Sequence, residues 1–289
     1  MLHRFILHND AFRDYAAAEL SPSQVGLLSG WGVFSTLRVS GGVLFAWERH
    51  WARITRDAHA LHVPLPADPE KLRNRLLELV EANGSPDCTL RLVIVRNGGG
   101  IWANPKPERP CDVIALTADT KHWGSSVKLA IQPQARHAAN PFAGTKILSW
   151  AMNLTWIETA QARGFDEVIL LNERGEVSEC TSANLFVANG DVVSTPPLSS
   201  GCLPGITREV LLGEIHVPGV KIEERTLTPV DLFSADEVFI TSTTRDLLEV
   251  VQIEDKPVGR ANRLCHTLGS AFSGFIERYV AEHKPAPAV

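Results

Sequence analysis

Long apolar runs are missing from this 289-residue chain, and no two of its cysteines are spaced as CxxC. No window approaches the roughly 20 apolar residues that a membrane-spanning helix needs. The cysteine count is odd, which favours free thiols over a disulfide framework or a structural zinc site; the five are Cys88, Cys111, Cys180, Cys202 and Cys265. The ten histidines show no HExxH-type spacing, so we expect no metal site.

An excess of positive charge is also missing. Lys and Arg number 28 against 33 Asp and Glu, a formal net charge of −5, and no basic stripe for nucleic-acid phosphates stands out. The hydrophobic content of 44% and charged content of 21% are those of a soluble globular protein. Charges and histidines interrupt the first residues, MLHRFILHNDAF, which therefore make a poor signal peptide. We expect a cytoplasmic protein.

Short strand and helix patterns alternate along the chain, which predicts a mixed α/β fold in two domains. We expect a small N-terminal α/β domain at 1–117, an inter-domain linker at 118–126 (ADTKHWGSS) and a large C-terminal domain at 127–289. The alternation at 28–39 predicts a strand, with Gly41-Gly42 as the following turn.

Two patterns in the second half are relevant to the site. Helical spacing at 148–163, ended by Gly164, predicts a long helix. Asn189-Gly190 predicts a hairpin between the apolar segments on either side of it.

Lysine is scarce, at eight residues against twenty arginines, and Lys146 has an unusual position among the eight. It follows Gly144-Thr145 and precedes an apolar stretch. Loss of solvation there favours the neutral amine, which is the form that attacks a carbonyl. A lysine that extends to solvent from a helix start is the commoner arrangement, so the position alone makes Lys146 only a candidate.

Three further segments carry candidate groups. Glu179 lies between small or apolar neighbours, where a carboxylate could hold a pyridine nitrogen protonated. The loop before Ile206 runs from glycine into a helix whose free N–H groups could bind an anion, with the hydroxyl of Thr207 beside them. The strand end ITSTT supplies more hydroxyls, and Arg53 is a candidate phosphate partner. Each feature alone also has an ordinary structural explanation.

Taken in order, these segments resemble the class IV (fold type IV) aminotransferases, which depend on pyridoxal 5′-phosphate (PLP). That family includes branched-chain aminotransferases, D-amino acid aminotransferases and aminodeoxychorismate lyases. The most specific part of the resemblance is ExxxxNLF, beginning at Glu179, followed by LPGITR, beginning at Leu203. The resemblance extends from Gly26 to Gly259.

The resemblance implies a role for individual residues. Lys146 matches the lysine that binds PLP covalently, and Glu179 matches the residue that pairs with the pyridine nitrogen. The phosphate would be bound by the matching residues Arg53, Ile206, Thr207, Ser242 and Thr243. The substrate pocket would be lined by Gly32-Val33-Phe34 and Thr244, with either Arg91 or Arg96 binding the substrate carboxylate.

Two departures from the family pattern are visible. Branched-chain enzymes commonly have phenylalanine-glutamate-glycine where this chain has Phe34-Ser35-Thr36. Neither Tyr15 nor Tyr279 lies at the motif position of the tyrosine that often contacts the phenolic oxygen of PLP.

The resemblance also implies an overall fold and an activity. The fold would have a smaller N-terminal domain and a larger one with a barrel-like sheet, with the pocket between them completed by a second subunit of a homodimer. The activity would move an amino group between a small amino acid, a branched-chain L- or a D-amino acid, and a 2-oxo acid such as 2-oxoglutarate. An aminodeoxychorismate lyase that releases pyruvate and 4-aminobenzoate is the alternative.

Overall fold

The computed structural model describes residues 1–21, 24–101, 107–259 and 262–284. These form two compact units, each considered by itself. Unit 1 consists of the described residues of Met1–Lys121, Lys146–Trp150 and 277–284, and unit 2 of those of His122–Thr145 and Ala151–Ile276.

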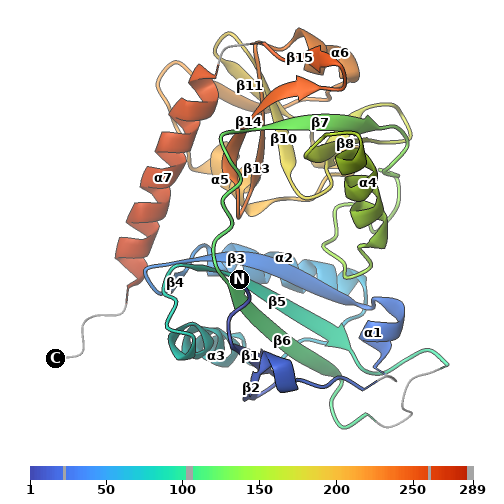
Figure 1. Cartoon of the computed structure of the whole chain (residues 1–289), viewed down its shortest axis with the longest axis vertical. Coiled ribbons are helices and arrows are strands. Elements are labelled where there is room, and N and C mark those ends of the chain that lie inside the picture. Colours follow the sequence, from blue (N-terminus) through green and yellow to red (C-terminus); the bar gives the residue numbers. More distant parts are fainter. Residues whose placement is uncertain (22–23, 102–106, 260–261, 285–289) are drawn as a thin grey trace. The chain divides into compact units, whose positions relative to one another are not determined.

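An antiparallel sheet forms the centre of unit 1 (Figure 1), in the order β2-β1-β6-β5-β3-β4. As predicted, Gly41 and Gly42 make a two-residue turn, with φ of 54° and 78°, values that glycine adopts without strain. The strands of this sheet are β1 (Phe5–His8), β2 (Ala11–Asp14), β3 (Gly32–Ser40), β4 (Val43–Leu44), β5 (Cys88–Arg96) and β6 (Cys111–Ala118).

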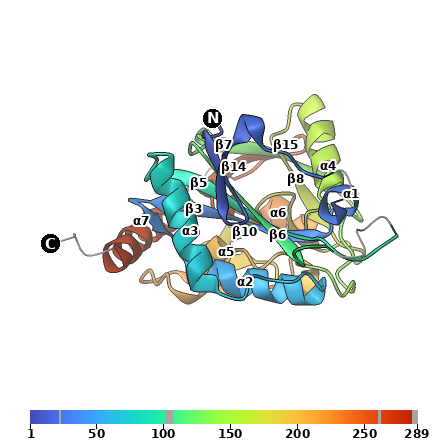
Figure 2. The ribbon, with the colours of Figure 1, turned by 90° about the horizontal axis from the view of Figure 1, so that it is seen from below.

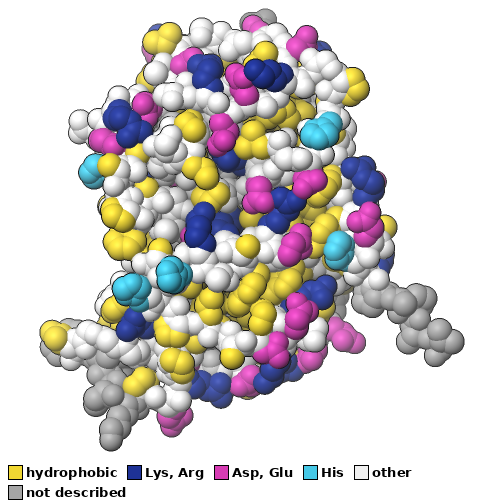
Figure 3. All heavy atoms as spheres, turned by 180° about the vertical axis from the view of Figure 1, so that it is seen from behind, with side chains coloured by type: hydrophobic (Ala, Val, Ile, Leu, Met, Phe, Trp, Pro, Cys, Tyr) yellow, Lys and Arg dark blue, Asp and Glu magenta, His cyan; other side chains and the backbone are white. Residues whose placement is uncertain are grey.

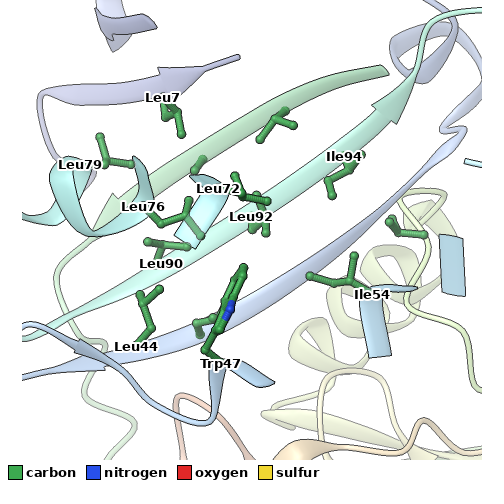
Figure 4. Close-up of a cluster of buried hydrophobic side chains, with 14 of the residues drawn as sticks. Leu7, Leu44, Trp47, Ile54, Leu72, Leu76, Leu79, Leu90, Leu92 and Ile94 are labelled. Carbon is green, nitrogen blue, oxygen red and sulfur yellow. The ribbon is translucent and has the colours of Figure 1, made fainter. Parts of the chain in front are cut away.

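Helices α2 (Trp47–Ala60) and α3 (Pro69–Ala82) cover one face of this sheet (Figure 2). The Asp68 side chain caps α3 by accepting the N–H of Lys71 at 2.9 Å. The core places leucines of α3 and Trp47 and Ile54 of α2 against the leucines of β5 (Figure 4). This packing fixes α2 on the sheet, and α2 carries Arg53.

The strand predicted at 28–39 is shorter than expected at its N-terminal end. It begins at Gly32, because Leu28 lies in the short helix α1 (Val25–Ser29) and Gly30 turns the chain with φ of 61°. A 3₁₀ turn, η1 (Tyr15–Ala17), precedes α1.

Unit 2 contains a nine-stranded mixed sheet in the order β12-β11-β10-β13-β14-β7-β8-β9, with β15 paired to β14 (Figure 1). The pairs β11–β12, β14–β7 and β7–β8 are parallel. The strands are β7 (Ser126–Gln132), β8 (Glu167–Leu171), β9 (Val177–Cys180), β10 (Asn184–Asn189), β11 (Val192–Thr195), β12 (Lys221–Glu224), β13 (Glu237–Ser242), β14 (Asp246–Ile253) and β15 (Lys256–Pro257).

The predicted hairpin across Asn189-Gly190 is confirmed as the antiparallel pair β10–β11. Helix α4 packs through Ala160 against β7 and β8. The helices of this part are α4 (Ala151–Ala162), α5 (Ile206–Gly213), α6 (Pro229–Ser234), the 3₁₀ turn η2 (Leu198–Ser200) and α7 (Arg263–His283), whose residues up to Ile276 belong to unit 2.

The helix predicted at 148–163 begins later than expected, at Ala151. The preceding residues instead pair with β3: Ile147 bridges Val33, and the Leu148 N–H donates to the Gly32 carbonyl at 3.0 Å. This pairing is why Lys146–Trp150 belongs to unit 1, although the predicted domain boundaries placed these residues in the second domain. The expected linker at 118–126 has neither helix nor strand between Ala118 and Ser126.

The class of the fold is mixed α/β with a curled sheet in unit 2, as predicted. Lys and Arg side chains are interspersed with Asp and Glu on the face shown in Figure 3. Across the described ranges, no helix is both long and apolar enough to cross a membrane. Within those same ranges, no group of three or more His, Cys, Asp or Glu side chains is placed to hold a metal ion.

Candidate active site

The backbone of Lys146 is held on both sides. Its N–H donates to Oδ2 of Asp57 at 3.0 Å, and its carbonyl accepts the N–H of Phe34 at 3.1 Å. The side chain extends over the Phe34 ring, with Nζ 4.6 Å from the ring centroid. Lys146 is half-buried, so its amine lies against an apolar ring and remains accessible to a small molecule.

Glycine is required two residues before this lysine. Gly144 has φ of 71°, and a Cβ there would lie 2.7 Å from the carbonyl oxygen of Cys202. The glycine that the sequence pattern singled out is therefore needed both for its backbone conformation and for a close backbone approach.

Arg53 is one of three buried polar side chains joined by hydrogen bonds. It is only 8% exposed, and its Nη2 donates to Oγ of Ser35 at 3.0 Å. Ser35 Oγ lies 2.8 Å from Nδ1 of His50. Because an arginine only donates, the serine proton is left for Nδ1, and His50 carries its own proton on Nε2. Burial, and then the charges of Arg53 and Lys146, lower the pKa of His50 well below its ordinary value, in agreement with a neutral ring.

The two arginines of β5 have different surroundings. The Arg91 guanidinium lies over the Phe34 ring, 4.4 Å from its centroid. Arg96 instead stacks on Trp31 at 4.4 Å and donates to the backbone carbonyls of Gly98 and His62. Arg91 and Lys146 thus contact the same aromatic ring, whereas Arg96 stabilises a loop.

In unit 2, Glu179 lies on β9 and is 8% exposed. Both of its oxygens accept hydrogen bonds: Oε1 from Nε of Arg136 at 3.1 Å, and Oε2 from the Leu203 N–H at 2.9 Å. Arg136 is itself oriented by Oδ1 of Asn153, at 3.3 Å. Two donors on its two oxygens fix the plane of this carboxylate and suit its ionised form.

The LPGITR motif forms the start of α5. Gly205 is the N-cap residue and has no side chain to cap the helix, and Ile206 and Thr207 are buried in its first turn. A Cβ on Gly205 would lie 2.0 Å from Oδ1 of Asn184, whose Nδ2 donates to the Leu203 carbonyl at 2.9 Å. The asparagine of the NLF motif thus fixes the loop, and only glycine fits there. The first-turn N–H groups are a site for an anion.

The hydroxyl-rich segment follows β13. Ser242 ends that strand, and its Oγ accepts the N–H of Arg245 at 3.2 Å. The Arg245 guanidinium forms a buried ion pair with Glu167 at 3.1 Å and lies 3.7 Å from the centroid of the Trp123 ring. This ion pair fixes the end of the loop that carries Thr243 and Thr244.

Comparison with known proteins decides the family. Residues 32–253 match the family model described as amino-transferase class IV. The chain is 31% identical over 255 residues to a protein of Methanocaldococcus jannaschii provisionally named branched-chain-amino-acid aminotransferase, covering 86% of this chain and 88% of the relative.

The chain belongs to the class IV aminotransferase family.

Other members of the family agree in sequence and structure. D-alanine aminotransferase of Bacillus licheniformis is 29% identical over 272 residues, covering 88% of this chain and 90% of that protein. A branched-chain amino acid aminotransferase of T.th., complexed with N-(5′-phosphopyridoxyl)-L-glutamate, is 26% identical with a TM-score of 0.87, covering 97% of this chain and 96% of that one. The predicted family, fold, aminotransferase activity and PLP dependence are thereby confirmed.

The residues of this class IV aminotransferase suit PLP. A dianionic phosphate suits the uncapped start of α5 in unit 2, where Gly205 leaves no room for a Cβ, and it suits the guanidinium of Arg53 in unit 1. A protonated ring nitrogen suits the Glu179 carboxylate. The aldehyde suits a primary amine on a fixed backbone, as at Lys146.

Four residues that orient the predicted side chains escaped the sequence patterns: Ser35, Asp57, Arg136 and Asn153. Asp57 is 89 residues from Lys146 in the sequence, and Arg136 is 43 residues from Glu179. No local motif connects residues so far apart. Ser35 gave a partial signal, because it stands where branched-chain enzymes commonly have glutamate.

Proposed function

We propose that this enzyme transfers the amino group of a small, apolar amino acid to 2-oxoglutarate, with the branched-chain L-amino acids as donors. The observation that carries this is the position of Lys146 and Arg91 on the same Phe34 ring, at 4.6 and 4.4 Å from its centroid. Trp150 packs edge-on against that ring at 6.4 Å. An amine and a guanidinium beside apolar rings suit an amino acid with an aliphatic side chain.

In the proposed roles, PLP supplies the aldehyde that takes up the amino group and the ring that accepts electrons. Lys146 binds the aldehyde and, once displaced by substrate, moves the proton from the substrate Cα. Glu179 holds the ring nitrogen protonated. Phosphate is bound by Arg53 and by the segments that carry Thr207 and Thr243, with Ile206 and Ser242 contributing through the same segments.

The names of the relatives support this choice of donor but also include D-alanine. An amino-donor panel tests the choice: purified enzyme with 2-oxoglutarate and L-leucine, L-valine or D-alanine, followed by glutamate formation. We expect L-leucine and L-valine to be the faster donors. Faster glutamate formation from D-alanine would overturn the proposed L-specificity. Pyruvate release from aminodeoxychorismate without an added oxo acid would support the lyase alternative instead.

Arg91 is expected to bind the substrate carboxylate. Replacing it in Arg91→Gln removes a charge-assisted bond to a bound carboxylate, so KM for L-leucine should rise about 10- to 100-fold, with kcat changed much less. Arg96→Gln is the matched control on the same strand, and its KM should stay within about threefold of wild type because Arg96 bonds only to loop carbonyls and Trp31 in the described contacts. If Arg96→Gln raised KM more than Arg91→Gln did, the roles of the two arginines would be reversed.

We also propose that the enzyme is a homodimer. Apolar side chains on and near α4 are exposed in the single chain: Met152 is 66% exposed, Leu154 49% and Phe142 50%. Apolar residues gathered on one element are typical of a protein interface. Cytoplasmic location is proposed because all five cysteines are free and buried, and burial raises the pKa of Cys202 and Cys265 to about 12. Cell fractionation tests the location.

The dimer should depend on α4. In the double variant Met152→Glu and Leu154→Glu, two carboxylates would have to be buried in the interface, so sedimentation should show a monomer at concentrations where wild type is a dimer. Val230→Glu, at an exposed valine of α6, adds the same charge elsewhere and should leave the dimer intact. A dimeric double variant would exclude α4 from the interface.

A further inference from the structure

Helix α2 carries a buried polar face. His50, Arg53 and Asp57 follow one another at helical spacings of three and four residues, and they are 0%, 8% and 1% exposed. Polar groups this deeply buried persist only where partners satisfy them. The preceding observations account for Arg53 and His50 through Ser35. Asp57, at the end of the same face, is not explained by the phosphate or by the core.

The partners of Asp57 divide between its two carboxylate oxygens. Oδ1 accepts Nε of the neighbouring Arg56 at 2.9 Å, and the Arg56 side chain extends to the surface. Oδ2 accepts the backbone N–H of Lys146 at 3.0 Å. One oxygen therefore has a cation that offsets the charge, and the other binds the residue that the function depends on.

This hydrogen bond lies at a turning point of the chain. The residues up to Thr145 belong to unit 2, and Lys146 is the first residue of the segment that pairs with β3. The bridge between Val33 and Ile147 and the bond from the Phe34 N–H hold the segment from the β3 side. On the N-terminal side of Lys146, its own N–H is held by the Asp57 carboxylate.

We propose that Asp57 is a positioning residue for Lys146: its carboxylate fixes the Lys146 backbone, so that the amine stays over the Phe34 ring. The effect of Asp57 on catalysis rests on the proposed role of Lys146. The effect on the backbone does not, because it concerns only the Lys146 N–H. Reacting groups that are misplaced by about 1 Å can lose about 100-fold in rate, so a single anchoring bond is enough to matter.

The experiment compares Asp57→Ala with Asp57→Asn in the purified full-length enzyme. Asparagine keeps an acceptor oxygen at nearly the same place, whereas alanine removes it. Three quantities are measured: hydrogen exchange of the Lys146 amide by mass spectrometry of the cofactor-free protein, the rate at which the cofactor absorbance band appears after PLP is added, and kcat and KM per bound cofactor.

For Asp57→Ala we expect exchange of the Lys146 amide at least 10-fold faster, appearance of the band about 10-fold slower, and kcat lowered about 10- to 100-fold with KM within threefold. Asp57→Asn should restore the exchange protection and return kcat to within about fivefold of wild type. This rescue separates positioning from a general requirement for a buried charge.

Glu237 provides a matched control. It is 4% exposed and accepts backbone N–H groups of Leu264 and Cys265 at 3.0 Å, as Asp57 accepts that of Lys146, but in unit 2 at the start of α7. Glu237→Ala should lower thermal stability and leave the Lys146 exchange rate and kcat per bound cofactor within about threefold of wild type.

Unchanged exchange of the Lys146 amide in Asp57→Ala would overturn the proposal, as would an unchanged kcat or an equal loss of kcat in Glu237→Ala. If Asp57→Ala does not fold, Asp57→Asn decides alone, and loss of exchange protection at Lys146 despite the retained oxygen would then refute it. A different outcome tests the underlying function: if borohydride reduction labels a lysine other than Lys146 while the exchange result holds, Asp57 anchors this backbone but the assignment of Lys146 is wrong.

Discussion

Lys146→Ala should abolish turnover, with kcat lowered about 10⁴-fold or more, because the variant loses both the amine that binds the aldehyde and the group that moves the Cα proton. The absorbance band of the covalently bound cofactor should be lost as well. Direct evidence comes from wild-type enzyme with PLP, reduced with borohydride, digested and weighed. The pyridoxyl mass should appear on the peptide that contains Lys146.

The control is Lys128→Ala, at an exposed lysine of β7. It removes an equal charge and should leave kcat within about twofold of wild type, because an exposed side chain outside the site contributes little. A Lys146→Ala enzyme with normal turnover, or a pyridoxyl group on another lysine, would refute the assignment of Lys146.

The sequence located the chemical groups better than it located what orients them. Lys146, Glu179 and the LPGITR loop are contained in short segments, where glycine, an apolar stretch and a helix start each have a local physical reason. The structure shows why two of these glycines are needed: a Cβ at Gly144 or Gly205 would meet a backbone or side-chain oxygen. Such requirements are local, and a single sequence can reveal them.

The orienting contacts join residues that are distant in the sequence. The helix expected at 148–163 illustrates why they were missed. Its apolar periodicity continues back to Leu148, but the N–H of Leu148 bonds to Gly32 of β3, and α4 begins only at Ala151. Tertiary pairing overrode the local preference there. The same pairing carries Lys146 into unit 1, so the predicted domain boundary at 118–126 could not anticipate this second crossing of the chain.

The two arginines of β5 show a limit of a different kind. Arg91 and Arg96 lie on the same strand, and the sequence pattern alone could not choose between them. The choice comes from what each guanidinium contacts, Phe34 beside Lys146 for Arg91 and loop carbonyls for Arg96. An arginine whose donors are already bonded to the backbone has fewer left for a substrate carboxylate.

Glu179→Gln is expected to have the second largest effect. The carboxylate is held between two donors, the Arg136 guanidinium and the Leu203 N–H. A glutamine can present only one oxygen, so its amide nitrogen must face one of these donors, and the negative charge beside the ring nitrogen is lost. The rate of the first half-reaction with L-leucine, measured by stopped-flow absorbance without oxo acid, should fall about 10²- to 10³-fold.

Cofactor binding should survive in this variant, because the phosphate contacts proposed for Arg53 and the start of α5 are untouched. Glu237→Gln is the control for losing one buried carboxylate in unit 2, and its half-reaction should run within about threefold of wild type. Arg136→Gln should give an intermediate loss, since it keeps the charge of Glu179 but removes one of the two donors that hold its plane. A Glu179→Gln enzyme whose half-reaction is as fast as wild type would remove Glu179 from the ring nitrogen, and with it the reason for the Arg136–Asn153 contact behind it.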